Sequence, residues 1–455
     1  MRSFVSVFAV AAFLATSAHA QTPWTVQPQW VAAHEAFLAS DALRGRGSAT
    51  PDEAIAAAYV AAQFQAYGLK FAPGMTGYEQ TAWVVTPKLT GQASLTAGGV
   101  TVGEGHGLTL LVSSAHNITG TVQVVTSDDP AALPAGDILM VNATGTTSPM
   151  NWIRAAHAKG AKLVLFRDND AMQALYSRIG GATRVSAYLE DKPPEAGSTD
   201  SAIVSSDVFD KLATTPGASA TLDLGAVALV KSVTTNTIGY LPGSDPKAGV
   251  ILITAHMDHL GVKPDGTIMH GANDDASGTT AVLEVAHALT AGQAPKRGIL
   301  FVGYGSEEIG GLGSTFFGMH PPVPLSDIVA NLEFEMIGAH DPKMMPGEMM
   351  MTGFDRSDLG ETLKAHGALV APDLYPDQHF FERSDNYSLA LQGIVAHTIS
   401  GWAVTPTYHD PSDDLAHLDI PFMTQAIQSL IAPVEFLANS DFKPSWKPGG
   451  NPQKK

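Results

Sequence analysis

The chain has 455 residues and a formal net charge of −18 at pH 7, from 26 lysine and arginine residues against 44 acidic residues. This balance excludes a nucleic acid as the main partner, because phosphate binding requires a basic surface. The sequence contains no cysteine, so disulfides, lipidation on cysteine and thiolate metal sites are excluded as well. The length is greater than that of an ordinary single domain.

The first 20 residues have the pattern of a secretory signal peptide. Arg2 precedes an apolar segment that runs from Phe4 to Leu14, and the small residues Ala18 and Ala20 form a cleavage site. The apolar segment is short for a membrane span, so a membrane anchor is the weaker alternative. We therefore expect an exported protein without a membrane anchor, periplasmic or secreted after cleavage near Ala20.

The segment from about Trp30 to Tyr67 is predicted to be helical. Residues 105–226 then change in character, because they are rich in Val, Thr, Gly and Ala and contain none of the ordered histidine and acidic motifs found later in the chain. Within this region we expect a strand over 136–142, a helix over 151–159 and a second strand over 162–166. The pattern predicts a separate β-rich domain inserted into the chain.

A buried strand is predicted from Val250 to Thr254, because a continuous apolar and β-branched run suits a parallel sheet that is covered on both faces. His256 and Asp258 follow at its carboxyl end, where open α/β sheets place their ligand sites. A His-x-Asp pair makes physical sense when the imidazole binds a metal and the aspartate fixes the orientation of the ring.

Two adjacent aspartates, Asp274 and Asp275, precede a predicted buried helix from Thr279 to Leu289. Acidic residues at this position commonly cap a helix, and the pair alone supports that interpretation equally well. The alternative is that one carboxylate caps the helix while the other reaches inward and bridges two cations.

Glu307 and Glu308 follow another apolar strand, Ile299 to Val302. Adjacent carboxylates repel each other unless a cation or a shared proton offsets their charge. A metal-assisted hydrolase needs one carboxylate to hold a metal and one to take a proton from its water. A solvated surface pair is the alternative for these two residues alone.

Two later segments add an acid and a histidine. Glu335 lies at the end of the apolar segment that begins at Ile328, as a metal-ligand candidate or an edge-strand charge. His409 lies in a polar loop after the apolar run 394–399, where it would complete a metal set or remain solvated. In the first case, Asp413 would hold the second ring nitrogen of His409.

Taken together, these candidates provide two histidines and three carboxylates. Such nitrogen and oxygen ligands suit zinc, with manganese or cobalt as substitutes. Five ligands with one bridging carboxylate suit two ions about 3.5–4 Å apart, so we expect two Zn²⁺ per chain. Strands alternate with helices throughout this region, which predicts an α/β fold with a mixed, mostly parallel central sheet flanked by helices.

The motifs resemble those of the co-catalytic di-zinc aminopeptidases, a zinc exopeptidase family whose relatives include glutamate carboxypeptidase, glutaminyl cyclase and the transferrin receptor ectodomain. The segment from Leu38 to Gly47 also resembles the opening segment of bacterial members. The family motifs occur in order: His-x-Asp at 256–258, Gly-Ala-x-Asp-x-Ala-Ser-Gly at 271–278, Glu-Glu at 307–308, the acid before Met-Ile-Gly at 335, and Tyr-His at 408–409.

The resemblance implies a role for each residue. Asp274 would bridge two ions, of which one is held by His256 and Glu335 and the other by Glu308 and His409. Glu307 would be the general base, and Asp258 would support catalysis beside it. Two positions depart from the family pattern: Glu335 stands where Asp is usual, which keeps a carboxylate, and Asn386 stands where His is usual, which would alter contacts with substrate.

The resemblance also implies the domain organisation. Residues 21–104 and 227–440 would form a discontinuous catalytic domain, and residues 105–226 would form an inserted protease-associated domain. An independent β-rich decoration is the alternative for the insertion and predicts the same chemistry. Residues 441–455 are rich in Pro, Gly and Lys, and we predict that they are disordered.

The function implied is metal-dependent hydrolysis of N-terminal peptide bonds, with peptides as substrates. Tyr387 is a candidate donor to the developing oxyanion. Trp402 and Tyr408 flank His409 in the sequence and are candidate walls of a pocket for an apolar side chain. We assign hydrogen-bonding or loop roles to His259 and His270, because the family template uses neither.

Three alternatives remain open at the level of sequence. A carboxypeptidase would need a cation for the carboxylate of its substrate, and Arg383 is a candidate. A glutaminyl cyclase would use one metal and would not need His256. A binding scaffold would have kept the fold and lost catalysis, but such a protein has no need of a complete ligand set.

Overall fold

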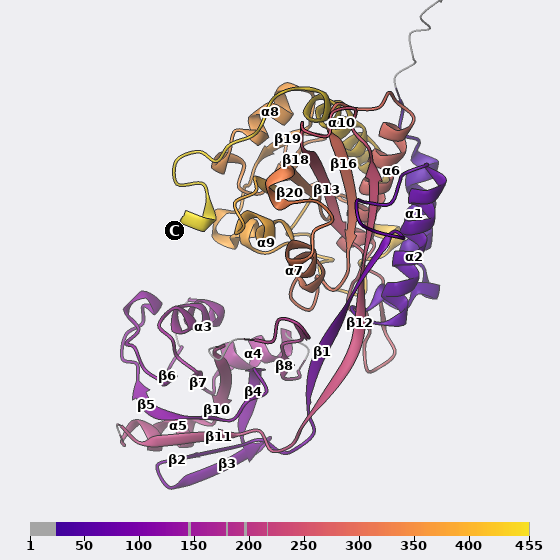
Figure 1. The fold of residues 1–455 in the computed structure, drawn as a ribbon. Helices are drawn as coiled ribbons and strands as arrows, with labels where there is room; N and C mark the ends of the chain where they lie inside the picture. Colours follow the sequence, from indigo (N-terminus) through magenta and orange to yellow (C-terminus); the bar gives the residue numbers. More distant parts are fainter. Residues whose placement is uncertain (1–23, 144–146, 179–180, 195–197, 216, 455) are drawn as a thin grey trace, which may run out of the picture.

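The computed structural model describes residues 24–143, 147–178, 181–194, 198–215 and 217–454. The predicted signal peptide, residues 1–20, lies outside the described residues. The chain forms two parts joined by a long antiparallel strand pair, β1 (Glu79–Leu89) and β12 (Val227–Leu241) (Figure 1). None of the described helices is long and apolar enough to cross a membrane.

The larger part is built on a mixed nine-stranded sheet in the order β19-β18-β20-β17-β13-β16-β12-β1-β9. Its centre is parallel, as predicted, and consists of β20 (Ala396–Ser400), β17 (Ile328–Phe334), β13 (Val250–His256) and β16 (Gly298–Tyr304). The edges are formed by β12, β1 and β9 (Tyr188–Leu189) on one side and by β18 (Met349–Met351) and β19 (Val370–Pro372) on the other.

Helices cover both faces of this sheet. One face packs against α1 (Pro28–Leu38), α2 (Pro51–Ala66), α6 (Ser277–Thr290), α8 (Leu359–Ala365) and α10 (Ile420–Asn439). The other packs against the short helices α7 (Leu312–Met319) and α9 (Asn386–Ala390). The predicted helical segment from Trp30 to Tyr67 corresponds to α1 and α2 with a short 3₁₀ turn, Asp41–Arg46, between them.

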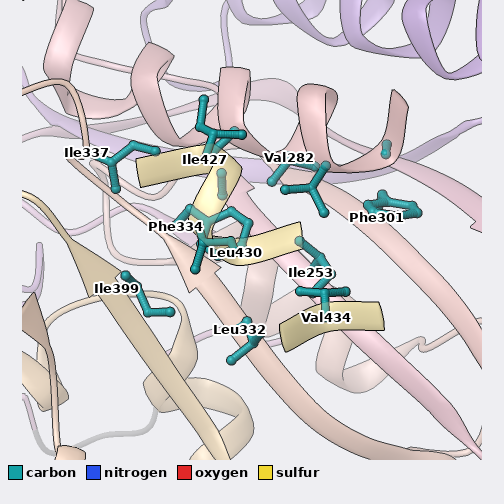
Figure 2. Close-up of a cluster of buried hydrophobic side chains, with 14 of the residues drawn as sticks. Ile253, Val282, Phe301, Leu332, Phe334, Ile337, Ile399, Ile427, Leu430 and Val434 are labelled. Atoms are coloured by element: carbon teal, nitrogen blue, oxygen red, sulfur yellow. The ribbon is translucent and has the colours of Figure 1, made fainter. Parts of the chain in front are cut away.

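The core follows from the two-residue period of the buried strands. In β13, Ile251 and Ile253 face α6 and α10, whereas Val250 and Leu252 face the opposite layer. Figure 2 shows Ile253 in the first of these layers with Phe301, Leu332 and helix side chains such as Leu430. Burial of each such side chain stabilises the fold by about 1.5–3 kcal/mol relative to exposure.

The smaller part is a closed β-barrel, because β10 pairs with β4 and completes the ring. Its strands are β2 (Ser94–Ala97), β3 (Val100–Glu104), β4 (Gly107–Ser113), β5 (Ile118–Val124), β6 (Ile138–Val141), β7 (Leu163–Arg167), β10 (Asp200–Val204) and β11 (Ser219–Asp223). Helix α5 (Ser206–Ala213) packs with the interior, and α3 (Pro149–Ala158) packs outside.

The barrel agrees with the elements expected in the insertion, because β6, α3 and β7 occupy the predicted strand, helix and strand. Its strands begin at Ser94, so the expected boundary at residue 105 falls after β3 instead of at the start of the barrel. The resemblance to a protease-associated domain stays a prediction, since the structure establishes a β-barrel with peripheral helices.

The predicted disorder of residues 441–455 is wrong for the described residues 441–454. Trp446 pairs with Ser357 in a β-bridge, and its indole N–H donates to the carbonyl oxygen of Gly393 at 3.1 Å. Phe442 and Trp446 both pack against the core of the larger part. Two aromatic side chains therefore anchor this segment, despite its high content of Pro, Gly and Lys.

Candidate metal centre

The predicted ligands gather at the carboxyl ends of the parallel strands. His256 is the last residue of β13, Glu308 lies in the turn after β16, and Glu335 directly follows β17. His409 lies in the loop after β20, and Asp274 lies in the turn before α6. Because these strands run side by side in the sheet, segments far apart in the sequence meet at one edge.

Asp274 lies between the two predicted histidine ligands. Its Oδ1 is 3.2 Å from His256 Nε2, and its Oδ2 is 3.2 Å from His409 Nε2. His409 Nε2 is also 3.1 Å from Glu308 Oε2. Ligand atoms that share a tetrahedral zinc with bonds of 2.0–2.2 Å lie about 3.3–3.6 Å apart, so these separations come close to such a shell.

Several polar atoms of the cluster are buried and have no hydrogen-bond partner within the described chain. They are His256 Nε2, Asp274 Oδ2 and Glu308 Oε1. Unpartnered buried polar atoms are costly, and bound cations offset that cost. One possible metal-binding group consists of His256, Asp274 and Glu335, whose ligand atoms lie within 4.8 Å of one another. The residues present therefore fit a pair of divalent cations.

The electrostatics of the cluster agree with this fit. Burial opposes ionisation of Asp274, but its contacts with His256 and His409 outweigh burial and hold its pKa well below the usual range. Burial likewise opposes protonation of His409, but Asp274 and Glu308 outweigh it and raise its pKa to about 10. In the absence of a metal, the carboxylates thus hold a proton on this imidazole, which is typical of a site with a strongly negative potential.

The backbone at the cluster is strained in three ligand-bearing segments. Ser306, Met336 and His409 have φ values of 56°, 54° and 55°, in the left-handed region that residues other than glycine adopt infrequently. Such conformations occur preferentially at functional sites, where the surrounding structure enforces them. Glu53 enforces the first, because its Oε2 accepts hydrogen bonds from the backbone N–H and hydroxyl of Ser306, each at 3.0 Å.

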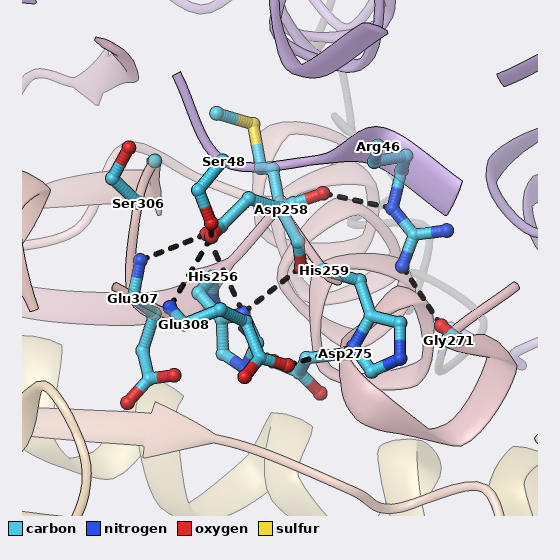
Figure 3. A network of polar contacts seen from close by, with 12 residues as sticks. Arg46, Ser48, His256, Asp258, His259, Gly271, Asp275, Ser306, Glu307 and Glu308 are labelled. Atoms are coloured by element: carbon cyan, nitrogen blue, oxygen red, sulfur yellow. Dashed lines mark hydrogen bonds and ion pairs between the residues drawn. The ribbon is translucent and has the colours of Figure 1, made fainter. Parts of the chain in front are cut away.

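Asp258 connects the predicted base to the predicted ligands. Its carboxylate accepts hydrogen bonds from the backbone N–H groups of Glu307 and Glu308 at 3.0 and 3.3 Å, and from the Ser48 hydroxyl at 2.5 Å (Figure 3). Its Oδ1 lies 3.6 Å from Nδ1 of His256, and its carbonyl oxygen lies 3.2 Å from the same nitrogen. One aspartate thus orients the imidazole and also fixes the turn that carries both glutamates.

Asp413 does not contact the ring of His409 as predicted. Its carboxylate instead accepts hydrogen bonds from the backbone N–H groups of Asn273 and Asp274 at 2.8 and 3.0 Å. Burial raises the pKa of Asp413 to about 6. Asp413 therefore fixes the turn that carries the shared carboxylate, and it influences the candidate metal centre through Asp274.

Three residues that support the cluster were missed at the level of sequence, and His259 lies closer to the ligands than expected. His259, for which hydrogen-bonding or loop roles were predicted, is completely buried, and its Nδ1 lies 2.7 Å from Glu308 Oε1. Glu53 and Ser48 lie more than two hundred residues before the turn that they support. Arg46 is buried and donates to the carbonyl oxygens of Met257 and Gly271, each at 2.8 Å. No local sequence pattern indicates such long-range contacts. The one available signal is that His259 directly follows Asp258 in the sequence.

A pocket opens next to the cluster. Among the residues that line it are Glu307, Arg383 and Tyr408, whose catalytic or substrate-binding roles stay predictions. Trp402 and Tyr387 are not among the described residues that line this pocket, so the structure does not support their predicted roles. Tyr387 packs instead against Phe381, with ring centroids 5.9 Å apart.

Asn386 is also part of the scaffold. It is completely buried, and its side-chain oxygen accepts a hydrogen bond from the Thr398 hydroxyl at 2.9 Å. Its backbone N–H donates to the buried carboxylate of Glu333. Asn386 therefore has a scaffold role in the structure, and its effect on contacts with substrate stays a prediction.

A family model places the larger part among known proteins. Residues 236–434, which contain every predicted metal ligand, match the model of peptidase family M28. We call the larger part the M28 domain after this match, which covers less than half of the chain. The match confirms the resemblance drawn from the sequence motifs.

Curated relatives of this M28 domain include two bacterial enzymes. Aminopeptidase YwaD of Bacillus subtilis is 28% identical over 226 residues, which are 48% of each protein. Leupeptin-inactivating enzyme 1 of Streptomyces exfoliatus is 36% identical over 109 residues, which are 24% of this chain and 23% of that protein. The chain thus spans about half or less of the length of these relatives.

Solved structures show the same fold over most of the chain. The aminopeptidase from Aneurinibacillus sp. strain AM-1 superimposes with a TM-score of 0.59 at 19% identity, covering 91% of this chain and 94% of that one. BSAP, a zinc aminopeptidase from Bacillus subtilis, superimposes with a TM-score of 0.55 at 20% identity, covering 91% and 96%. The predicted α/β architecture of the M28 domain is thereby confirmed.

Proposed function

We propose that the chain is an exported, two-zinc aminopeptidase that removes residues from the amino end of peptides. The observation that carries this proposal is the position of Asp274, whose two carboxylate oxygens each lie 3.2 Å from a different imidazole. A carboxylate in this position is suited to bridging two cations. The M28 match and the zinc aminopeptidase fold support zinc as the metal.

In this proposal Asp274 belongs to two ligand sets. His256 and Glu335 complete the first set, and Glu308 and His409 complete the second. When bound, a pair of zinc ions lowers the pKa of a water molecule and polarises the scissile carbonyl group. The absence of cysteine leaves these nitrogen and oxygen atoms as the natural zinc ligands of the chain.

Glu307 is the proposed general base. Its side chain lines the pocket next to Asp274 and Glu335, and its backbone N–H is fixed by Asp258 at 3.0 Å. Burial raises the pKa of the Glu307 carboxyl well above its usual value, which increases the proton affinity of the carboxylate. Glu307 takes a proton from the attacking water and then passes it to the nitrogen of the leaving amine.

The pocket fits the amino end of a peptide. Carboxylates of Glu307 and Glu335 form part of its wall and attract a free ammonium group. Apolar side chains such as Met336, Met350 and Phe380 form another part and suit an apolar first residue. Arg383 is also in the wall, so a carboxypeptidase that binds the carboxyl end of its substrate remains the second candidate.

The test combines metal analysis with a choice of substrates. We expect two zinc ions per chain and hydrolysis of aminoacyl anilides, but no hydrolysis of peptides whose amino end is blocked. Cleavage of amino-blocked peptides with a free carboxyl end would favour the carboxypeptidase. One zinc with cyclisation of glutaminyl peptides would favour the cyclase, and absence of zinc and of any hydrolysis would favour a binding scaffold.

A further inference from the structure

His259 lies beside the second ligand set, although the proposed function does not use it. Its Nδ1 is 2.7 Å from Glu308 Oε1 and 3.9 Å from Asp274 Oδ2. Within the described chain, neither ring nitrogen of His259 has a hydrogen-bond partner of acceptable geometry, and neither does Glu308 Oε1. These two buried atoms lie closer together than the roughly 3.3–3.6 Å expected of two ligands on one tetrahedral zinc, but both lack a hydrogen bond, and a cation that moves them apart would satisfy both.

The surrounding backbone packs closely around the imidazole ring of His259. The backbone N–H of His259 donates to the carbonyl oxygen of Arg46 at 3.0 Å. Gly271, with φ of 60°, lies against the ring, and a Cβ atom at this position would be 2.4 Å from Cγ of His259. The Arg46 side chain donates to Gly271 and to Met257, so it holds together the two loops that enclose the ring (Figure 3).

His259 and His409 have the relative placement of two imidazoles on one ion. Their ring centroids are 5.7 Å apart, with an angle of 72° between the ring planes. Two imidazoles that share a zinc through bonds of about 2.0–2.1 Å have centroids about 5–6 Å apart. The two rings also approach different oxygens of Glu308, His259 at Oε1 and His409 at Oε2.

We propose that His259 binds the second metal ion through Nδ1, as a fourth protein ligand beside Asp274, Glu308 and His409. This inference rests on the proposed two-metal function. Four protein ligands fill a tetrahedral shell, whereas the three ligands of the other set leave one position open. The set that contains His256 therefore keeps a tetrahedral position for water or substrate.

The first test counts coordinated imidazoles in the full-length wild-type protein loaded with cobalt(II). A coordinated imidazole has a ring N–H proton with a strongly shifted NMR signal, and ¹⁵N labelling of histidine identifies such signals. We expect three, from His256, His259 and His409. Two signals from a protein that binds two cobalt ions would overturn the inference and leave the proposed function intact, whereas absence of cobalt binding would overturn both.

The second test compares His259→Ala with the control His270→Ala. His270 lies in the neighbouring loop and pairs through Nε2 with Asp41 at 2.7 Å, away from the ligands. We expect the cobalt form of His259→Ala to lose one shifted signal. We also expect its affinity for one zinc ion, measured by competition with a chelator, to fall by about 10–100-fold. His270→Ala should resemble wild type in both measurements. His259→Asn replaces the alanine variant if circular dichroism shows misfolding. Three signals and unchanged zinc affinity in a folded variant would overturn the inference.

Discussion

Two adjacent aspartates at the centre of the site have different tasks. Asp274 faces the imidazoles of His256 and His409. Asp275 accepts hydrogen bonds from the backbone N–H groups of Gly278 and Met336, each at 2.9 Å, and of His256 at 3.3 Å. Asp275 thus connects the ends of β13 and β17 with the start of α6. Its bond to Gly278 is the helix-capping role that the sequence offered for one member of the pair.

Substitution of Glu307 by Gln tests the proposed general base at the residue scale. The change keeps the shape of the side chain but removes the proton acceptor, so we expect kcat to fall by about 10²–10⁴. Zinc content should stay at the wild-type value, because Glu307 is outside both ligand sets. Steady-state kinetics and metal analysis check this, with the exposed Glu435→Gln as control. Full activity of Glu307→Gln would refute the assigned role.

His397 makes a second prediction at this scale, on stability against pH. It is buried between the Ser357 hydroxyl at 2.8 Å and the Thr352 carbonyl oxygen at 2.9 Å. Burial lowers its pKa from 6.5 to about 4. Between these pH values the His397 side chain binds a proton in the unfolded chain but not in the folded chain. Its contribution to the free energy of unfolding is therefore fully present above pH 6.5 and is lost as the pH falls toward 4.

The expected loss from His397 at pH 4.5 is about 2–3 kcal/mol of the free energy of unfolding. Urea titrations at pH 7 and pH 4.5, with chelator present, measure it. His397→Gln cannot titrate and serves as the reference, because the other ionisable groups contribute equally to both proteins. An identical pH dependence of the two proteins would show that the buried imidazole does not titrate as stated.

At the scale of elements, the start of α6 is packed against β17 without space for a side chain. A Cβ atom at Gly278 would lie 2.1 Å from the carbonyl oxygen of Phe334 and 2.4 Å from the Asp275 carboxylate. We therefore expect Gly278→Ala to destabilise the protein by about 1–3 kcal/mol and to weaken zinc binding, although alanine favours helices.

Gly292→Ala is the matched control for this substitution. Gly292 follows the C-terminal end of α6. A Cβ atom at Gly292 would lie 3.5 Å from the carbonyl oxygen of Leu289, which is an ordinary contact. Thermal unfolding and chelator competition compare the two variants. If Gly278→Ala is as stable as Gly292→Ala, the close packing of α6 on β17 is not a requirement of the fold.

The strands β13, β16 and β17 could be predicted from the sequence because each is a buried apolar run followed by a histidine or an acid. The parallel order of β13, β16 and β17 then brings those ends together. The partner of Asp413 could not be predicted, because its contact with the 273–274 backbone depends on a loop with no regular pattern. Closure of the barrel by β10 and β4 has no local signal either, since it pairs strands about ninety residues apart.

At the scale of the whole molecule, the two long strands β1 and β12 connect the barrel to the M28 domain. Leu89 and Val227 are the last pair of this ribbon. The described residues between 90 and 226 contribute no side chain to either main core cluster of the M28 domain or to its candidate metal groups, although Leu189 joins a smaller cluster with Val84 and Leu312. The M28 domain therefore has the core and the ligands for independent folding.

We expect that replacement of residues 90–226 by an Asn-Gly turn leaves a folded protein that binds zinc with unchanged stoichiometry. The turn continues the β1–β12 hairpin without changing its register. The deletion also removes β9 and exposes the edge of β1, so lower solubility is expected. Circular dichroism and metal analysis check this, with full-length Leu189→Ala as the control for the lost β9 contact. An unfolded deletion variant would show that the barrel is required for the fold.

The Arg46 side chain has a consequence for how the protein is made. It reaches backbone oxygens that lie 211 and 225 positions later in the chain. Ribosomes produce the guanidinium long before they produce those oxygens, so its docking must wait until more than half of the polypeptide exists. Closing so large a loop is slow. We therefore expect metal binding to be a late event in maturation, after the beginning of the chain has joined the two loops.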